Sequence, residues 1–340
     1  MKFNSEAEMM VANAEGVYLP QDNGNPAPGI ACMANAARFI EAHFSEPLTT
    51  YAIGWRDQEG LQDLLDFVAP PVEVPRRFEY ISYVNPEAFL SETDDIRAIG
   101  SDFKRVEYTQ SKQTSSTLNK GLTYRVDLDN VDQNTNWREK IVSQLQLRII
   151  RNDVRRAMAL AVAAATNTNV NWTTHTGSGA LGSDADPDME LTQAVINFVS
   201  AVGIAPTSLL FDLTAWGKRF LAARASNSAG NFASAGLTVD QVAQLVGCQK
   251  GMISRYQYQS TPSAKASVLG GAYVLVFLAN AAQSIDDPSN LKRFVTQTQG
   301  GTMVRVYEQQ MTMKLIDISV EMYSRPVLTS SLGIQLATVS

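Results

Sequence analysis

The sequence has few of the residues from which most catalytic, metal-binding and disulfide-rich sites are built. Its 340 residues include only two histidines, His43 and His175, and two cysteines, Cys32 and Cys248. Two cysteines are too few for a disulfide framework, and neither histidine lies in a cluster with metal-ligand spacing. The nucleophile motif G-x-S-x-G is also absent. We therefore expect no catalytic site, no metal and no cofactor, and we interpret both cysteines as small apolar residues.

Long apolar runs and an excess of positive charge are absent too. No stretch approaches the roughly 18 uncharged apolar residues of a membrane span, so we expect no contact with a membrane. Aspartate and glutamate total 34 against 28 lysines and arginines. The net charge of −6 argues against a protein that binds nucleic acid through an overall positive field. The first ten residues include acids and lack an apolar signal core, so we expect synthesis in the cytoplasm.

What the chain does contain is a pattern typical of one long amphipathic helix at residues 137–165. Its apolar residues recur mostly at spacings of three and four, as on a helix that lies along a core. About 29 residues at about 1.5 Å each make a rod of about 44 Å, far longer than an ordinary globular helix. A coiled coil is the alternative, but the apolar period is not a sustained heptad.

A polar segment, residues 92–129, precedes this helix. Within it, residues 103–109 and 122–128 are strand-like, and the polar residues 110–121 between them predict the tip of a long hairpin. A two-stranded hairpin with little to bury is marginal in water by itself. We therefore expect it to lie on a partner surface, for which another copy of the chain is one candidate.

The remaining elements predict a mixed α/β unit followed by long strands. A capping box opens a helix at Thr238, and Asp212 or Thr214 caps the helix that carries Trp216. The last strand alternates apolar and polar residues, so it has one face to bury, and we expect the long helix to cover it. The expected helices are 31–43, 58–67, 190–202 and 239–246, and the expected strands are 77–88, 208–211, 252–258, 272–278, 303–309 and 311–323.

Two short motifs carry an alternative chemistry. Residues 177–182 match the dinucleotide-binding pattern G-x-G-x-x-G, but no buried strand precedes them, and we interpret them as a loop. Asp184, Asp186 and Asp188 alternate as calcium ligands do, but the glycine and glutamate of a calcium loop are missing from their positions. We interpret these acids as the start of a helix, where they complement the helix dipole.

This order of elements resembles that of the major capsid proteins of tailed bacteriophages, which have the Hong Kong 97-like fold. The residues that carry the resemblance are 72–84, 97–129, 137–165, 209–221, 239–258 and 304–326. The resemblance implies an α+β fold of four parts. They are an N-terminal arm at 1–66, a peripheral domain with the spine helix at 67–91, 130–176 and 300–340, an extended loop at 92–129 and an inserted mixed α/β axial domain at 177–299.

The resemblance also implies a function as a self-assembling shell in the virion. Pentamers and hexamers of the chain would enclose double-stranded DNA without sequence-specific contacts, with a separate scaffolding protein and a portal protein as partners. Charged residues of the loop would dock on a neighbouring subunit by charge pairing. These candidate contact residues are Arg97, Lys104, Arg105, Glu107, Lys112, Lys120 and Arg125. The alternatives are an encapsulin-like nanocompartment, a phage tail or head-completion protein, and an α/β enzyme that depends on His43 or His175.

Overall fold

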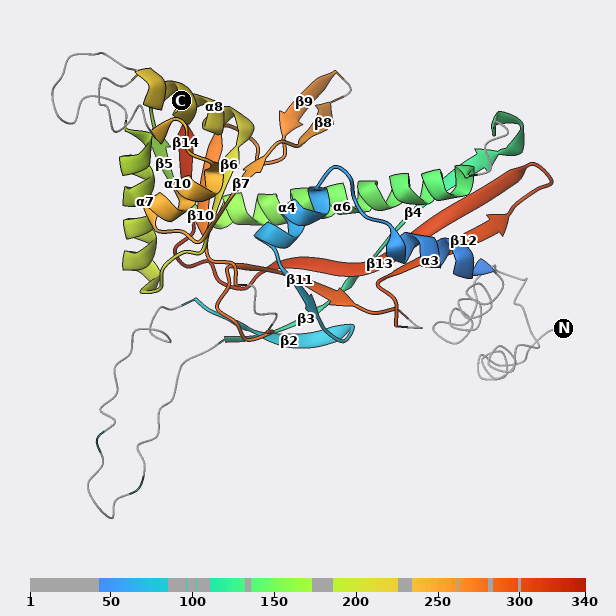
Figure 1. Cartoon of the computed structure of the whole chain (residues 1–340). Coiled ribbons are helices and arrows are strands. Elements are labelled where there is room, and N and C mark those ends of the chain that lie inside the picture. The colour runs from blue at the N-terminus through green and yellow to red at the C-terminus, as the bar shows by residue number, and fades with distance from the viewer. Residues whose placement is uncertain are drawn as a thin grey trace. The chain divides into compact units, whose positions relative to one another are not determined.

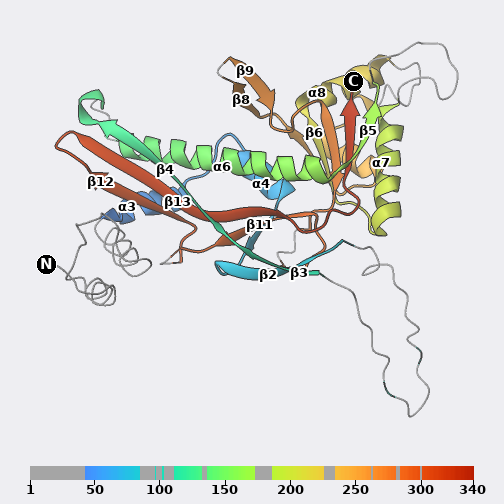
Figure 2. The same ribbon diagram turned by 180° about the vertical axis from the view of Figure 1, so that it is seen from behind.

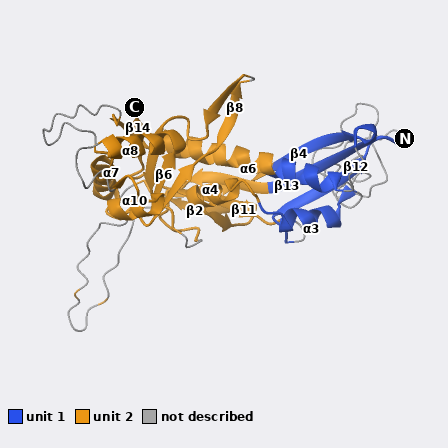
Figure 3. Ribbon diagram, turned by 45° about the horizontal axis from the view of Figure 1, so that its top comes forward, with its two compact units in different colours: residues 1–56, 120–146, 298–322 blue, residues 57–119, 147–297, 323–340 orange. Residues whose placement is uncertain are grey.

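The computed structural model describes residues 43–84, 96, 102, 111–131, 136–172, 186–225, 234–261, 263–280, 284–298 and 301–340 (Figure 1). The chain divides into two compact units (Figure 3). Unit 1 holds residues 1–56, 120–146 and 298–322, and unit 2 holds residues 57–119, 147–297 and 323–340. The long helix and two strands contribute residues to both units. The four-part division expected from the sequence stays a prediction.

Unit 1 is built on a pair of antiparallel strands. These are β12 (Val304–Gln310) and the first part of β13 (Leu315–Leu328), and β4 (Leu118–Asp127) also pairs with β13. Ile316, Ile318 and Val320 of β13 are buried, in alternation with more exposed polar residues. The one-sided strand expected from the alternating sequence is therefore confirmed.

Two helices pack on this strand pair. In α3 (Glu46–Gly54), Thr49 accepts a hydrogen bond through Oγ1 from the backbone N–H of Val306, at 3.1 Å. In the first part of α6 (Trp137–Ala164), Arg138 Nε donates to Glu308 Oε1 of β12 at 2.8 Å. The helix expected at 137–165 is confirmed, and so is its place beside the C-terminal strands.

In unit 2, one sheet continues from β13. Its residues 323–328 pair antiparallel with β11 (Leu291–Thr296), and β1 (Pro71–Glu73) pairs parallel with β11. The unit also contains α4 (Leu61–Val68) and a two-stranded ribbon of β2 (Arg77–Ser82) and β3 (Ser111–Ser116). Figure 2 shows the reverse view; in both views the ribbon lies on one side of β11 and β13, and the part of α6 in unit 2 lies on the other.

The second sheet of unit 2 has the strand order β5-β14-β10-β6-β7. Its core joins Phe198, Phe211, Val242 and Val274 with other fully buried apolar side chains. The strands are β5 (Thr166–Val170), β6 (Ser208–Asp212), β7 (Lys250–Ser254), β10 (Tyr273–Phe277) and β14 (Gln335–Val339). The helices are α7 (Pro187–Val202), α8 (Leu213–Ala225) and α10 (Val239–Val246).

Several local predictions for this part of the chain are confirmed. Thr238 forms the expected capping box with Gln241, and Asp212 is the residue that caps α8, because its Oδ2 accepts from the N–H of Thr214 at 2.8 Å. The single strand expected at 252–258 is wrong. The chain leaves β7 after Ser254 and forms a separate hairpin of β8 (Gln257–Thr261) and β9 (Ala264–Ser267).

A buried asparagine fastens the place where the chain crosses between the two sheets of unit 2. Asn290 is 1% exposed, and its Oδ1 accepts from the N–H of Leu278, just after β10, at 2.7 Å. Its Nδ2 donates to the carbonyls of Ser330 and Leu332, at 3.0 and 2.9 Å, on the path from β13 to β14. One side chain thus holds together two of the chain's passages between the sheets.

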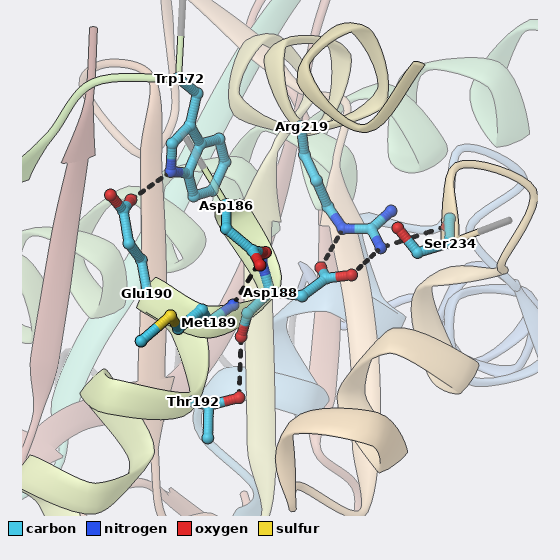
Figure 4. Close-up of polar contacts among 8 residues, drawn as sticks. All are labelled: Trp172, Asp186, Asp188, Met189, Glu190, Thr192, Arg219 and Ser234. Carbon is cyan, nitrogen blue, oxygen red and sulfur yellow. Dashed lines mark hydrogen bonds and ion pairs between the residues drawn. The ribbon is translucent and has the colours of Figure 1, made fainter. Parts of the chain in front are cut away.

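The contacts at the N-terminus of α7 show whether its aspartates start a helix or alternate as calcium ligands do (Figure 4). Asp186 caps the helix, because its Oδ1 accepts from the N–H groups of Asp188 and Met189. Both oxygens of Asp188 accept from the fully buried guanidinium of Arg219, at 2.9 and 3.0 Å. The helix-start interpretation is therefore confirmed for these two residues, while Asp184 lies outside the described residues.

The remaining sequence motifs lie partly within and partly outside the described residues. Cys248 is buried and burial raises the pKa of its thiol to about 12, so it behaves as an apolar residue. In the described part of the chain, no group of three histidines, cysteines or acids is placed to hold a metal ion. No helix in that part is long and apolar enough to cross a membrane. Cys32, His175 and the glycine motif at 177–182 lie outside it.

The buried ion pair at α7 generates a prediction for stability. Replacing Arg219→Met keeps most of the side-chain volume and leaves Asp188 without its partner, so we expect the free energy of unfolding to fall by about 3 kcal/mol. Urea denaturation measures this difference. The matched control is Arg224→Met, at the exposed C-terminal end of α8, for which we expect a change within about 0.5 kcal/mol. Equal losses in the two variants would show that the pair has no special weight.

Candidate functional site

The polar hairpin expected before the long helix is built differently from the prediction. Residues 110–121 are not its tip, because residues 111–116 form β3 and residues 118–127 form β4. The strand β3 pairs with β2, from Arg77 opposite Ser116 to Ser82 opposite Ser111, and β4 pairs with β13. The serines and threonines of β3 look like a turn in the sequence because this strand has no buried face to produce an apolar alternation. Residues 103–109 lie outside the described residues.

An aromatic cluster anchors the ribbon to the sheet of β11. The ring of Phe78 in β2 lies 4.4 Å from that of Phe294 in β11, centroid to centroid, and the Tyr80 ring lies 5.6 Å from the Phe294 ring. Phe294 is fully buried and Phe78 is 5% exposed. Val72, Val74 and Val327 complete this small core. We call it the ribbon root; because a two-stranded ribbon is marginal alone, the root stabilises the ribbon.

Hydrogen bonds fasten the ribbon at both ends. At one end, the buried Thr117 donates its N–H to the carbonyl of Arg76, at 3.0 Å, and its hydroxyl lies 2.9 Å from that of Thr296 in β11. At the other end, Tyr83 donates its N–H to the carbonyl of Thr329, at 3.0 Å, and its hydroxyl to the carbonyl of Asp286, at 2.6 Å. The position of the chain is therefore fixed on both sides of residues 85–110.

The outward part of the ribbon is polar. Residues 111–114 of β3 are all exposed, as are Arg77 and Glu79 in β2. Lys112, one of the contact residues expected from the sequence, lies in this stretch opposite Ile81. This exposed strand pair is the candidate surface for a contact with another molecule.

The other expected contact residues are placed differently. Lys120 in β4 is buried, 9% exposed. Arg125 is exposed but donates through Nε and Nη2 to the two carboxylate oxygens of Asp317 in β13, both at 2.8 Å. Its partner therefore lies 192 residues away in the same chain, which the local sequence does not reveal. Arg97, Lys104, Arg105 and Glu107 lie outside the described residues, and their role as contacts stays a prediction.

The ion pair between Arg125 of β4 and Asp317 changes the pKa of the aspartate. The hydrogen bond from Arg125 holds the pKa of Asp317 below its ordinary value, against the opposing effect of partial burial. A second pair in the same unit joins Lys314 Nζ to Asp129 Oδ2, at 2.6 Å, with both side chains more than half exposed. Exposed pairs of this kind contribute little stability, but they fix the register of β4 against β13.

Comparison with known proteins shows the fold. No protein-family model and no curated protein matches this sequence. A crystal structure of a phage-related protein from Bordetella bronchiseptica superposes with a TM-score of 0.63, at 17% sequence identity, over 87% of this chain and 97% of that one. The chain has the fold of that phage-related protein. The Hong Kong 97-like α+β fold that the sequence implied is thereby confirmed.

Other matches are weaker in geometry. They include a structure of Mycobacterium phage Bobi, with a TM-score of 0.49 and 13% identity over 82% of this chain and 90% of that one. The capsid of cyanophage P-SCSP1u matches with a TM-score of 0.48 and 10% identity over 81% and 87%. The structural matches are mainly phage capsids.

The ribbon root generates the second prediction. Replacing Phe294→Ala removes the ring on which Phe78 and Tyr80 pack, so we expect a loss of about 3–5 kcal/mol in the free energy of unfolding. We also expect faster hydrogen exchange at the backbone amides of β3, measured by mass spectrometry. Leu118→Ala is the control, because Leu118 is 47% exposed at the start of β4. Unchanged exchange in β3 after the Phe294 substitution would contradict an anchoring role.

The pair of Arg125 and Asp317 generates a prediction for pH dependence. Because the pKa of Asp317 is lowered in the folded chain, its ionised form stabilises the fold above the ordinary carboxyl pKa of about 3.9, and this contribution is lost as the pH falls through the lowered pKa. Asp317→Asn should therefore be less stable than the original chain at pH 7, with a difference that disappears in acid. Urea denaturation across this pH range measures it, and Arg125→Gln should show the same profile. A difference independent of pH would contradict the pairing.

Proposed function

We propose that this chain is a major capsid protein, which assembles into the pentamers and hexamers of an icosahedral shell around the double-stranded DNA genome of a tailed phage. The observation that carries the proposal is the fold shared with a phage-related protein across 87% of this chain. The order of its elements, with a long helix beside the C-terminal strands, is also the order in which the sequence resembles the major capsid proteins of tailed phages.

The ribbon supports assembly as the function. Its inner part is anchored by the buried Phe78 and Phe294, whereas its outer part exposes polar strand residues on both sides. An anchored ribbon gives residues 85–110 a fixed starting point from which to reach a neighbour. Repeated head-to-tail contacts of this type close into rings, which are the capsomers of a shell.

The charge of the chain is compatible with a container for DNA. A net charge of −6 disfavours tight contacts with phosphate groups, which would obstruct packaging and release. A separate scaffolding protein and a portal protein are the further partners that this function requires, with assembly in the host cytoplasm before the shell becomes part of the virion.

Two alternatives lead to different observations. An encapsulin-like nanocompartment would also form closed shells, but these would hold protein cargo instead of DNA. An α/β enzyme would remain a monomer or small oligomer, with a turnover that is lost when His43 or His175 is replaced.

Electron microscopy of a loop variant tests the proposal. Ser82 and Ser111 face each other in the ribbon, so Asn-Gly in place of residues 85–110 leaves, with Tyr83 and Val84, a four-residue loop that is able to join β2 to β3. We expect closed particles tens of nanometres across from the original chain, expressed with or without a scaffold, and a folded subunit without stable shells from the variant. Deletion of residues 110–121, which the sequence analysis interpreted as the hairpin tip, would instead remove β3.

The outcomes separate the alternatives. The fold of the variant is checked by circular dichroism and urea denaturation, so that a failure to assemble is not confused with a failure to fold. Shells of ordinary stability from the loop variant would contradict the role of the loop. Monomers or small dimers from the original chain under both conditions would contradict the capsid proposal itself.

A further inference from the structure

The sheet of unit 1 has one covered edge and one open edge. The strands β12, β13 and β4 lie side by side in it (Figure 3). At the β12 edge, the carbonyl of Val306 accepts from the N–H of Ser45, and its own N–H donates to Oγ1 of Thr49, both at 3.1 Å. The start of α3 thus covers this edge. On the other side, β4 pairs with β13 and with no second strand in the described part of the chain.

The open edge of β4 is able to form further backbone hydrogen bonds. Every second residue of an edge strand directs its N–H and C=O away from the neighbouring strand. In the part of β4 that belongs to unit 1, the side chains of Thr123 and Arg125 are exposed, and that of Tyr124 is 47% exposed. An extended segment that pairs with this edge satisfies the outward backbone groups, as in peptide recognition by strand addition.

A pocket of about 380 Å³ lies along this edge. Residues 124–127 of β4 line one wall, and the first turns of α6 line the other with Trp137, Lys140, Ile141 and Gln144. Trp137 and Ile141 are half-buried and the Tyr124 ring is exposed, so part of their apolar surface is open to a ligand. A side chain that enters beside the edge of β4 therefore meets apolar surface on both walls.

The pocket also holds a cation that a ligand is able to pair with. The ammonium of Lys140 is exposed and forms no ion pair with any residue that the structure describes. The other charged groups of the pocket have partners, since Arg125 pairs with Asp317 and Asp127 accepts from the N–H of Asp129. A segment with apolar side chains and one carboxylate on the same face matches this pocket.

The N-terminal part of the sequence contains a segment with this pattern. Residues 15–19 read Glu-Gly-Val-Tyr-Leu, and in an extended strand Glu15, Val17 and Leu19 lie on one face. That face carries one carboxylate and two branched apolar side chains. Val17 and Tyr18 are also the first adjacent pair of β-branched or aromatic residues in the sequence, and these residue types favour strands.

The chain is long enough to bring this segment to the open edge. The described residues begin at His43, and Phe44 forms a β-bridge with Tyr307 of β12. From β12 to β4 is a distance of about 10 Å, which is two strand spacings. Residues 20–30 alone span up to about 36 Å when they are extended. The segment is therefore able to reach the open edge without a second copy of the chain.

We propose that residues 15–19 pair with the open edge of β4 in their own chain, with Val17 and Leu19 in the pocket and Glu15 at Lys140. An open strand edge invites uncontrolled pairing between copies, so a segment that covers it keeps the free subunit from aggregating. The inference goes beyond the proposed function, because it concerns the single chain and holds whether or not that chain forms shells.

Hydrogen exchange of the unassembled full-length chain tests the contact. Mass spectrometry follows the backbone amides of residues 120–127. We expect Val17→Asp together with Leu19→Asp to speed the exchange of the protected amides roughly tenfold, and Val11→Asp, in the same part of the sequence, to leave it unchanged. The amides of β12 are the internal reference. Equal exchange in the two variants, or an equal acceleration in β12, would overturn the proposal.

Charge reversal tests the role of Lys140. We expect Lys140→Glu to speed the same exchange about threefold, as for an exposed ion pair, and Glu15→Lys to do the same. The chain with both substitutions should return to the original rate, because the attraction is restored with the signs exchanged. An additive acceleration in the double variant would contradict the pairing of these two side chains.

Disulfide formation tests which chain supplies the segment. The full-length chain carries Leu19→Cys and, in the pocket, Gln144→Cys, with Cys32→Ser; Cys248 is buried. On oxidation of the dilute protein we expect a disulfide within one chain, seen as a monomer that migrates faster. We expect none when Arg155→Cys, on an exposed residue of the same helix outside the pocket, replaces the pocket cysteine. A disulfide that forms only between differently tagged chains would overturn docking within one chain, and the absence of any disulfide would overturn the contact itself.

Discussion

The arrangement of unit 2 depends on the buried polar crossing between its two sheets. Two of the chain's passages between them run from β10 to β11 and from β13 to β14, and backbone groups that leave a strand inside a protein must find other partners. Asn290 supplies them for both passages through its side chain and its backbone, which accepts from Thr329 and Ser330. Lys292 adds a second set, because its ammonium donates to the carbonyls of Ser284, Ile285 and Asp287, at 2.6–3.0 Å. Burial lowers the pKa of Lys292 to about 8. The three carbonyls oppose this effect, because they accept hydrogen bonds from the ammonium form.

The crossing also places the strand on which the ribbon is anchored. The strand β11 begins immediately after Asn290, and Phe294 lies four residues further along it. Any shift of the crossing would therefore move Phe294 relative to Phe78 and Tyr80. Asp153 has a comparable role for the long helix, because this buried carboxylate joins Arg156 of α6 to Ser324 of β13. An unpaired carboxylate at that depth would be costly, so the helix has one position in which all three groups are satisfied.

The parts of the fold that could be predicted from the sequence are those with local causes. The period of α6, the capping box at Thr238 and the alternation in β13 each arise within a few neighbouring residues, and all three are confirmed. The strand β3 could not be recognised, because its partner β2 is about 30 residues away and its own residues are polar on both sides. The strand β14, too, has no hydrophobic alternation to mark it and owes its place between β5 and β10 to distant partners. The same limit applies to the candidate site: Lys112 is exposed as expected, but the partner of Arg125 is in another part of the sequence.

The polar character of the ribbon has a physical reason beyond solubility. An exposed strand pair offers unpaired N–H and C=O groups, and an apolar edge of this kind invites uncontrolled pairing between copies. Serine, threonine, glutamine and a lysine at residues 111–114 lower the energy of wrong contacts without preventing a correct one, since a neighbour with complementary charge still gains from docking. A shell needs many contacts that are individually weak and reversible, so that misplaced subunits dissociate. The strong packing of this chain is accordingly found in the ribbon root and the core, and the exposed ribbon that is proposed to meet a neighbour relies on polar and charged side chains.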